Sequence, residues 1–192
     1  MNNNEVLTRH IPYRLKAVST LSVALKLWPD NDVPVPMKIY FGDHLVVDSN
    51  SYGFLNPAIE CGLMHCRALL EFLGLRELNG QLRNIGRRHG DDVGIEQFTN
   101  TAGPLPMVTP TAAVAHYTGE GDEAERALIA VFHATNKGLA HLTNGLDVSK
   151  SDAHLIEIAS RGVPSLVISH LYTPLGLSAP DFDVTSRHGT RP

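Results

Sequence analysis

Polar side chains interrupt an otherwise apolar helical segment in 134-ATNKGLAHLTNG-145. His133, Lys137 and His141 recur at every fourth position, so on a helix they share one stripe, whereas Asn136 lies on a different side. A histidine supplies a general base near neutral pH. The stripe therefore predicts either a catalytic site, which Asn136 joins when a second helix or subunit closes over it, or the solvated face of an amphipathic helix.

A second group of residues suited to chemistry lies in the polar, glycine-punctuated segment 76–92. In 83-RNIGRRH-89, Arg83 is followed by the polar Asn84, and His89 comes six positions after the arginine. Cleavage of RNA by its own 2′-hydroxyl needs a general base and a cation that stabilises charge on the phosphate. A histidine and the planar fork of an arginine supply these two functions without a metal ion.

Supporting residues are expected on the strongly apolar segment 56–75. Arg67 and Glu71 are four residues apart, so they can belong to the same site or form an ordinary helix ion pair. On the same segment Cys61 and His65 also share a helix face, and a histidine of the stripe above could join them as a metal ligand. The sequence contains no CxxC or HxxxH motif. A metal site is therefore the lesser alternative, and no cofactor is predicted.

Hydrophobic periodicity indicates which elements position these residues. It predicts four substantial helices, over about residues 12–28, 57–73, 123–143 and 152–172. Gly42-Asp43 between two β-prone runs predicts a small hairpin near residues 37–48. The expected fold class is mainly α, a four- to five-helix bundle with that hairpin. Residues 1–192 are expected to form one domain with loose tails at 1–5 and 174–192, and the helices that are apolar on two sides predict an obligate homodimer.

Local signals set the expected ends of these helices. Asn56 and Pro57 suit the N-cap and the first helical position. Asp122 and Glu125 have the spacing of a capping box. Pro164 is expected to kink or split the last helix. A short helix is expected near 91–98, and an irregular loop over 99–111.

Composition excludes some broad classes of function. The chain has 192 residues, of which 43% are hydrophobic and 19% charged, and its formal net charge is -4. This charge gives no global signature for binding nucleic acid or an anionic membrane, although a local basic patch remains open. No apolar run approaches the roughly 18 to 20 residues that span a bilayer. The N-terminus also lacks the layout of a signal peptide, so we expect a cytoplasmic protein without membrane contact.

The segment 136-NKGLAHLT-143, which follows the helical segment 58–75, resembles a helix of a group of small bacterial helical proteins with the pattern Asn-Lys-x-x-Ala-His-Leu-Thr. Those proteins in turn resemble outlying members of the HEPN class, and the resemblance covers about residues 55–172. HEPN domains are dimeric four- or five-helix bundles, and many are ribonucleases in toxin, phage-defence or RNA-processing systems. Their signature is an arginine, usually followed by a polar residue, with a histidine four to six positions further on. Arg83 and His89 match it, whereas Thr135 stands where an arginine would pair with His141.

Three functions of different kinds follow. The first is a HEPN-like bundle that binds RNA or cleaves it without metal; its candidate catalytic residues are His141, Asn136, Lys137, Arg83 and His89, with Arg67, Glu71 and His65 in support. The second is a non-catalytic helical dimer that binds a protein partner or a small ligand, which Thr135 and the acidic net charge favour. The third is a metal-dependent enzyme in a helical bundle.

Overall fold

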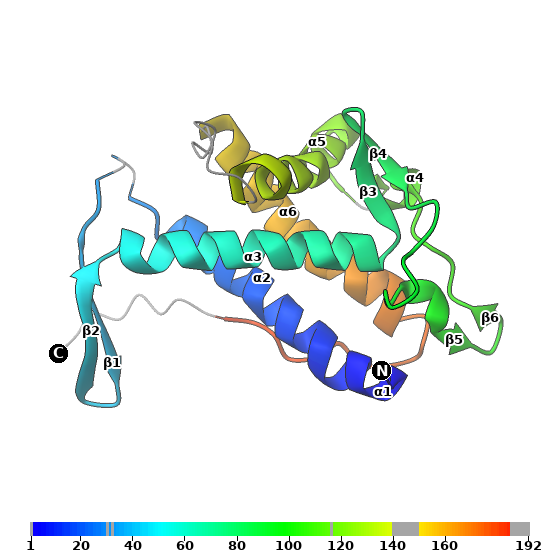
Figure 1. Ribbon diagram of the computed structural model, residues 1–192, viewed down its shortest axis with the longest axis horizontal. Helices are drawn as coiled ribbons and strands as arrows, with labels where there is room; N and C mark the ends of the chain where they lie inside the picture. Colours follow the sequence, from blue (N-terminus) through cyan, green and yellow to red (C-terminus); the bar gives the residue numbers. More distant parts are fainter. Residues whose placement is uncertain (1, 30, 32, 116, 140–149, 185–192) are drawn as a thin grey trace.

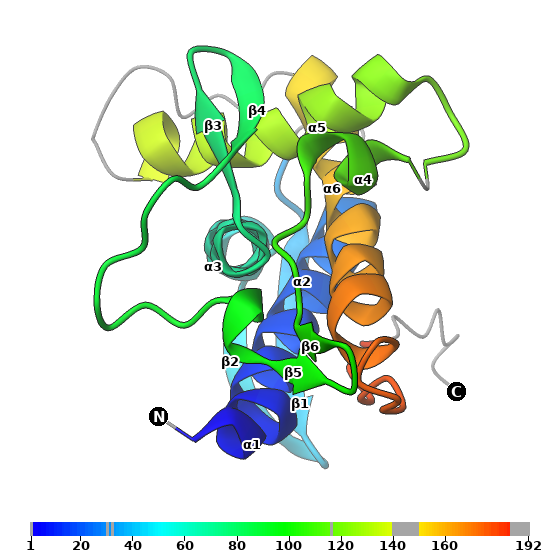
Figure 2. The ribbon, with the colours of Figure 1, turned by 90° about the vertical axis from the view of Figure 1, so that its right-hand side faces the viewer.

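A computed structural model describes residues 2–29, 31, 33–115, 117–139 and 150–184. The longest helices are α2 (Ile11–Lys26), α3 (Tyr52–Phe72), α5 (Gly121–His133) and α6 (Lys150–Val167). Shorter helical segments are α1 (Asn3–Glu5), α4 (Pro110–Val114), the 3₁₀ turn η2 (Ile95–Gln97) and the π-helical turns η1 (Val6–His10), η3 (Ala134–Leu139) and η4 (Ile168–Tyr172). In Figure 2, α3 is seen end-on with the other elements around it.

The core forms where α2, α5 and α6 pack around α3. Leu63, Cys66 and Leu70 of α3 are buried because they recur at helical spacing on the face toward the other helices. Gly62 sets the closest approach: a Cβ atom there would lie 2.3 Å from the Cβ of Leu21 in α2. The absence of a side chain at Gly62 therefore allows α2 and α3 to pack in contact at this point.

The fold-class prediction of a mainly α bundle is wrong. Three two-stranded antiparallel sheets accompany the helices, which makes the fold mixed α/β. Their strands are β1 (Pro36–Phe41) with β2 (His44–Asn50), β3 (Leu75–Leu78) with β4 (Gln81–Asn84), and β5 (Thr99–Asn100) with β6 (Gly103–Pro104). The hairpin expected near 37–48 is the first of these sheets. It projects from the N-terminal end of α3 (Figure 1).

The β3–β4 hairpin lies mostly in the polar, glycine-punctuated segment 76–92, for which no strand was predicted from the sequence. Its turn is Asn79-Gly80, with φ of 54° and 77°. Two successive positive φ angles define a type I′ turn, for which Asn-Gly is the preferred sequence. The dipeptide was therefore the available signal. The β5–β6 pair and the start of α4 likewise lie where an irregular loop was expected over 99–111. Of the short helix expected near 91–98, only the 3₁₀ turn η2 is present.

Several helix ends differ from their expected positions. Helical structure begins at Asn3, within the expected loose tail, and α3 begins at Tyr52, so that Pro57 lies inside the helix. At the start of α5 the carboxylate of Glu125 accepts the backbone N–H of Leu82 at 3.1 Å, so Glu125 holds β4 in place of closing a capping box. The last helix continues through Pro164 into η4 without a break. No helix in the described parts of the chain is long and apolar enough to cross a membrane.

Candidate functional site

A cleft of about 650 Å³ lies beside the C-terminal half of α3. The start of the chain and the loop after β4 form its other walls. Five arginines and three carboxylates are among the described residues that line it: Arg14, Arg67, Arg76, Arg87 and Arg88, with Glu71, Asp91 and Asp92. His10 and His89 also line the cleft. The excess of guanidinium groups makes the cleft locally basic on a chain whose formal net charge is -4.

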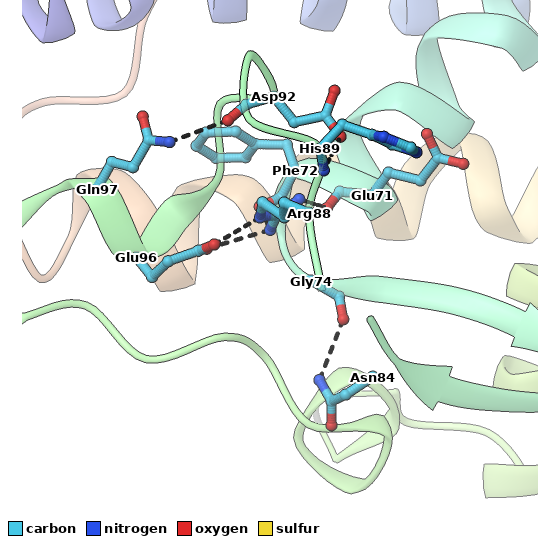
Figure 3. A network of polar contacts seen from close by, with 9 residues as sticks. All are labelled: Glu71, Phe72, Gly74, Asn84, Arg88, His89, Asp92, Glu96 and Gln97. Atoms are coloured by element: carbon cyan, nitrogen blue, oxygen red, sulfur yellow. Dashed lines mark hydrogen bonds and ion pairs between the residues drawn. The ribbon is translucent and has the colours of Figure 1, made fainter. Parts of the chain in front are cut away.

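Arg88 holds the wall of this cleft together (Figure 3). Its guanidinium donates to Glu71 O at 2.7 Å and to Phe72 O at 2.9 Å, the carbonyls at the C-terminal end of α3. It also pairs with both carboxylate oxygens of Glu96, at 2.5 and 3.1 Å. These hydrogen bonds lower the pKa of Glu96, although burial alone would raise it. Arg88 is 11% exposed and fully engaged, so its role is to fix the loop that carries its neighbours.

Arg67 links α3 to the π-helical turn η3. Its Nε donates to Glu71 at 2.8 Å, and its Nη1 donates to Oδ1 of Asn136 at 2.5 Å. In η3 the buried Thr135 hydroxyl donates to Val131 O at 2.8 Å and to Phe132 O at 3.1 Å. A π-helical turn weakens the regular hydrogen-bond ladder, and a threonine hydroxyl satisfies carbonyls that this widening leaves open. Thr135 therefore has a structural role in η3.

Arg14 approaches the cleft from α2. Its Nη1 donates to Nδ1 of His65 at 3.0 Å, which makes Nδ1 the acceptor nitrogen. Burial, and after it the charge of Arg14, lower the pKa of His65 from its ordinary 6.5, so the ring is neutral at pH 7. Tyr13 packs edge-on against the same ring, with centroids 5.2 Å apart. A neutral partner orients Arg14, and no carboxylate of the described residues compensates its positive charge.

Arg76 and Arg87 are exposed, and the side chain of neither forms a hydrogen bond or ion pair with the residues that the structure describes. Arg76 extends from β3, and Arg87 from the loop after β4. His89 is also exposed, and its backbone N–H donates to Asp92 at 3.1 Å. These side chains are consequently available to a molecule that enters the cleft.

The structure separates the residues that the sequence grouped into one site. Arg67, Glu71 and His89 line the cleft, and Asn136 contacts it through Arg67. Arg83, by contrast, bonds to Gln81 on β4 and is not among the lining residues, so the Arg83 and His89 pairing does not form one site. The side chain of Lys137 and all of His141 lie outside the described residues. His65 is not among the lining residues but contacts one of them, Arg14.

Sequence reasoning missed Arg14 and Arg76 as members of the site. Each is a single arginine on an amphipathic element, a pattern that is typical of a solvated surface. No spacing along the chain connects position 14 with position 76, because folding alone brings α2 and β3 to one cleft.

The metal hypothesis gains no support from the described residues, in which no three or more His, Cys, Asp or Glu side chains are arranged so that they could hold a metal ion. Cys61 is exposed, while burial raises the pKa of the Cys66 thiol and disfavours the thiolate that binds metal. Nε2 of the exposed His133 lies 3.9 Å from Oε1 of Glu77.

No protein-family model, curated protein or solved structure matches this chain. The cleft must therefore be interpreted from its own chemistry.

Proposed function

We propose that the chain binds RNA through its arginine cleft, with the phosphates contacted by Arg14, Arg76 and Arg87. The observation that carries this proposal is that three guanidinium groups from separate elements face one cavity without a carboxylate partner among the described residues. Arginine presents a planar fork of donors that matches phosphate oxygens. The HEPN-like resemblance, whose class includes many ribonucleases, favours RNA among phosphate polymers.

The lining also indicates how the RNA would be recognised. Phe72 is the one Phe, Tyr or Trp among the described lining residues, and it is buried. Stacking of bases on exposed rings of these three types is the common source of affinity for single strands that does not depend on phosphates. Without it, contacts to the sugar-phosphate backbone dominate. We therefore expect binding that depends strongly on salt and weakly on base sequence.

The binding test is a titration of a fluorescently labelled single-stranded RNA of mixed sequence, followed by anisotropy at several salt concentrations. Three phosphate contacts predict a slope of log K against log salt of about -2, which is roughly a 20-fold loss of affinity between about 50 and about 200 mM salt. The triple variant Arg14→Gln, Arg76→Gln, Arg87→Gln should abolish binding. Arg126→Gln, an exposed arginine on α5 outside the cleft lining, is the matched control.

The RNA proposal fails if the wild type does not bind RNA, or if the triple variant binds as the wild type does. A chain that binds phosphorylated mononucleotides but no RNA would instead support the small-ligand alternative, since the cavity volume lies in the range of ligand pockets.

Cleavage is a second candidate function, carried by His89. This histidine lines the cleft that the arginines line, so a 2′-hydroxyl held there would have a general base beside it. Incubation of the RNA with the wild type in the presence of a chelator should yield fragments, and His89→Ala should bind RNA without cutting it. Intact RNA after prolonged incubation with the wild type would limit the function to binding.

A further inference from the structure

His65 of α3 contacts one of the arginines of the cleft without lining the cleft itself. Its Nδ1 lies 3.0 Å from Nη1 of Arg14, which is a lining residue. An imidazole nitrogen accepts a hydrogen bond only while the ring is neutral, because the protonated ring carries a hydrogen on both nitrogens. The hydrogen bond between Arg14 and His65 therefore exists in only one of the two protonation states of the histidine.

The surroundings of His65 disfavour a proton on the ring in the free protein. Tyr13 packs edge-on against it, with ring centroids 5.2 Å apart. Burial, and after it the charge of Arg14, lower the pKa of His65 from its ordinary 6.5. Neither His65 nor Arg14 forms an ion pair with a carboxylate of the described residues. A proton on His65 would consequently meet the guanidinium charge with no anion to compensate it.

The other charged or titratable groups on the facing surfaces of α2 and α3 do not supply that anion. They are Tyr13 and Lys16 on α2 and Cys61 on α3, one turn before His65, and they line a hollow of about 240 Å³ between the two helices. Lys16 adds a second cation, and none of these groups is a carboxylate. An anion that comes to lie beside Arg14 must therefore come from a bound molecule.

We propose that His65 takes up a proton when an RNA phosphate binds Arg14, so that the cleft binds RNA more tightly as the pH falls. This coupling rests on the proposed function of the cleft as an RNA site. The phosphate adds a negative charge that compensates for the repulsion between guanidinium and imidazolium. Protonation also makes Nδ1 a donor, which frees the Nη1 hydrogen of Arg14 for a phosphate oxygen. His65 is thus a positioning residue that acts on the RNA through Arg14.

Thermodynamic linkage gives the sign and the size of the effect. A ligand that raises the pKa of His65 must bind the protonated protein more tightly, by the same factor. A rise of about one in this pKa corresponds to about a tenfold gain in affinity. The gain begins as the pH falls through the pKa of the RNA-bound state, and it is complete below that of the free protein, which is under 6.5. His10 and His89 also line the cleft and can add to the total, so a variant must isolate the part due to His65.

The test is the binding of a fluorescently labelled oligouridylate, followed by anisotropy at constant salt from about pH 8 to about pH 5, the range in which histidines titrate. Neither uracil nor the phosphodiester titrates there, so groups of the protein alone set the pH dependence. The wild type should gain about tenfold more affinity over this range than His65→Asn, whose amide oxygen can accept from Arg14 but cannot take up a proton. His44→Asn, exposed on β2 and outside the cleft lining, is the matched control and should behave as the wild type does.

An NMR titration of the imidazole Cε1–H signal gives a direct second measurement. The pKa of His65 should lie below 6.5 in the free protein and should rise when oligouridylate is bound. Thermal unfolding of both variants at each pH establishes that they retain the fold.

Two results would overturn the coupling and leave RNA binding in place: a pKa of His65 that RNA does not change, or a His65→Asn variant with the pH dependence of the wild type. A wild type that binds no oligouridylate at any pH would instead remove the proposed function, and the coupling with it.

Discussion

Replacement of Arg88 by methionine should destabilise the fold, although it removes only one partly buried side chain. The change leaves the carbonyls of Glu71 and Phe72 without their donor, and it leaves Glu96 without its cation. Loss of one partner from a buried, charged network costs about 3 to 5 kcal/mol. Because Glu96 is 31% exposed and can be hydrated, we expect about 3 kcal/mol, or a fall in Tm of roughly 6 to 12 °C for a chain of this length.

Urea unfolding followed by circular dichroism measures this free energy. Arg87→Met is the matched control, since Arg87 is adjacent, exposed and unpaired among the described residues; it should change stability by less than about 0.5 kcal/mol. The two variants should therefore differ in which property they change. Arg88→Met should lower the urea concentration at the midpoint of unfolding, while Arg87→Met should weaken RNA binding at unchanged stability. An Arg88→Met protein as stable as the wild type, or an Arg87→Met protein that is equally destabilised, would refute the division of roles.

Low pH should remove the contribution of the Arg88–Glu96 ion pair to the stability of the fold. The folded pKa of Glu96 is lowered, so its pairing with Arg88 is fully present above the ordinary value of 4.5 and is lost as the pH falls through the folded pKa. The stability difference between the wild type and Arg88→Met should consequently shrink below pH 4.5.

The remaining predictions concern packing and a second titration. Gly62→Ala should destabilise the fold by about 3 kcal/mol in urea titrations, because the new methyl group would overlap Leu21. Gly162→Ala in α6 meets nothing within 4 Å and should stabilise by up to about 1 kcal/mol; a loss of stability there would contradict the open space at that position. Because the folded pKa of His65 is lowered, the unfolded chain takes up a proton first, so stability should fall as the pH drops below 6.5. His65→Asn should flatten that part of the pH profile, and an unchanged slope would assign it to another group.

Local signals in the sequence predicted part of the fold. Gly42-Asp43 between β-prone runs correctly indicated a hairpin, and Gly74, with φ of 93°, follows α3 as a left-handed helix stop requires. Asn79-Gly80 was just as informative, but the polarity of the surrounding segment concealed it. The π-helical turns could not be predicted from 3.6-residue periodicity, because tertiary contacts stabilise them.

The candidate site was predictable only where its parts are close in sequence. Arg67 and Glu71 were found by their helical spacing, and His89 by its place in a basic cluster. The contact between Arg67 and Asn136 joins positions 69 residues apart, and no pattern along the chain links them. Arg83 was wrongly grouped with His89, because the two residues are close in sequence but only His89 lines the cleft.

The π-helical turn η3 makes the contact between α3 and the end of α5 depend on the number of residues as well as on their identity. One residue fewer before Asn136 would rotate that side chain by about 100° around the helix axis. Arg67 would then lose its amide partner although both residues were still present. In an engineered or evolved variant, a one-residue deletion in this turn would therefore uncouple the two helices as effectively as replacing Asn136, while the composition of the site remained the same.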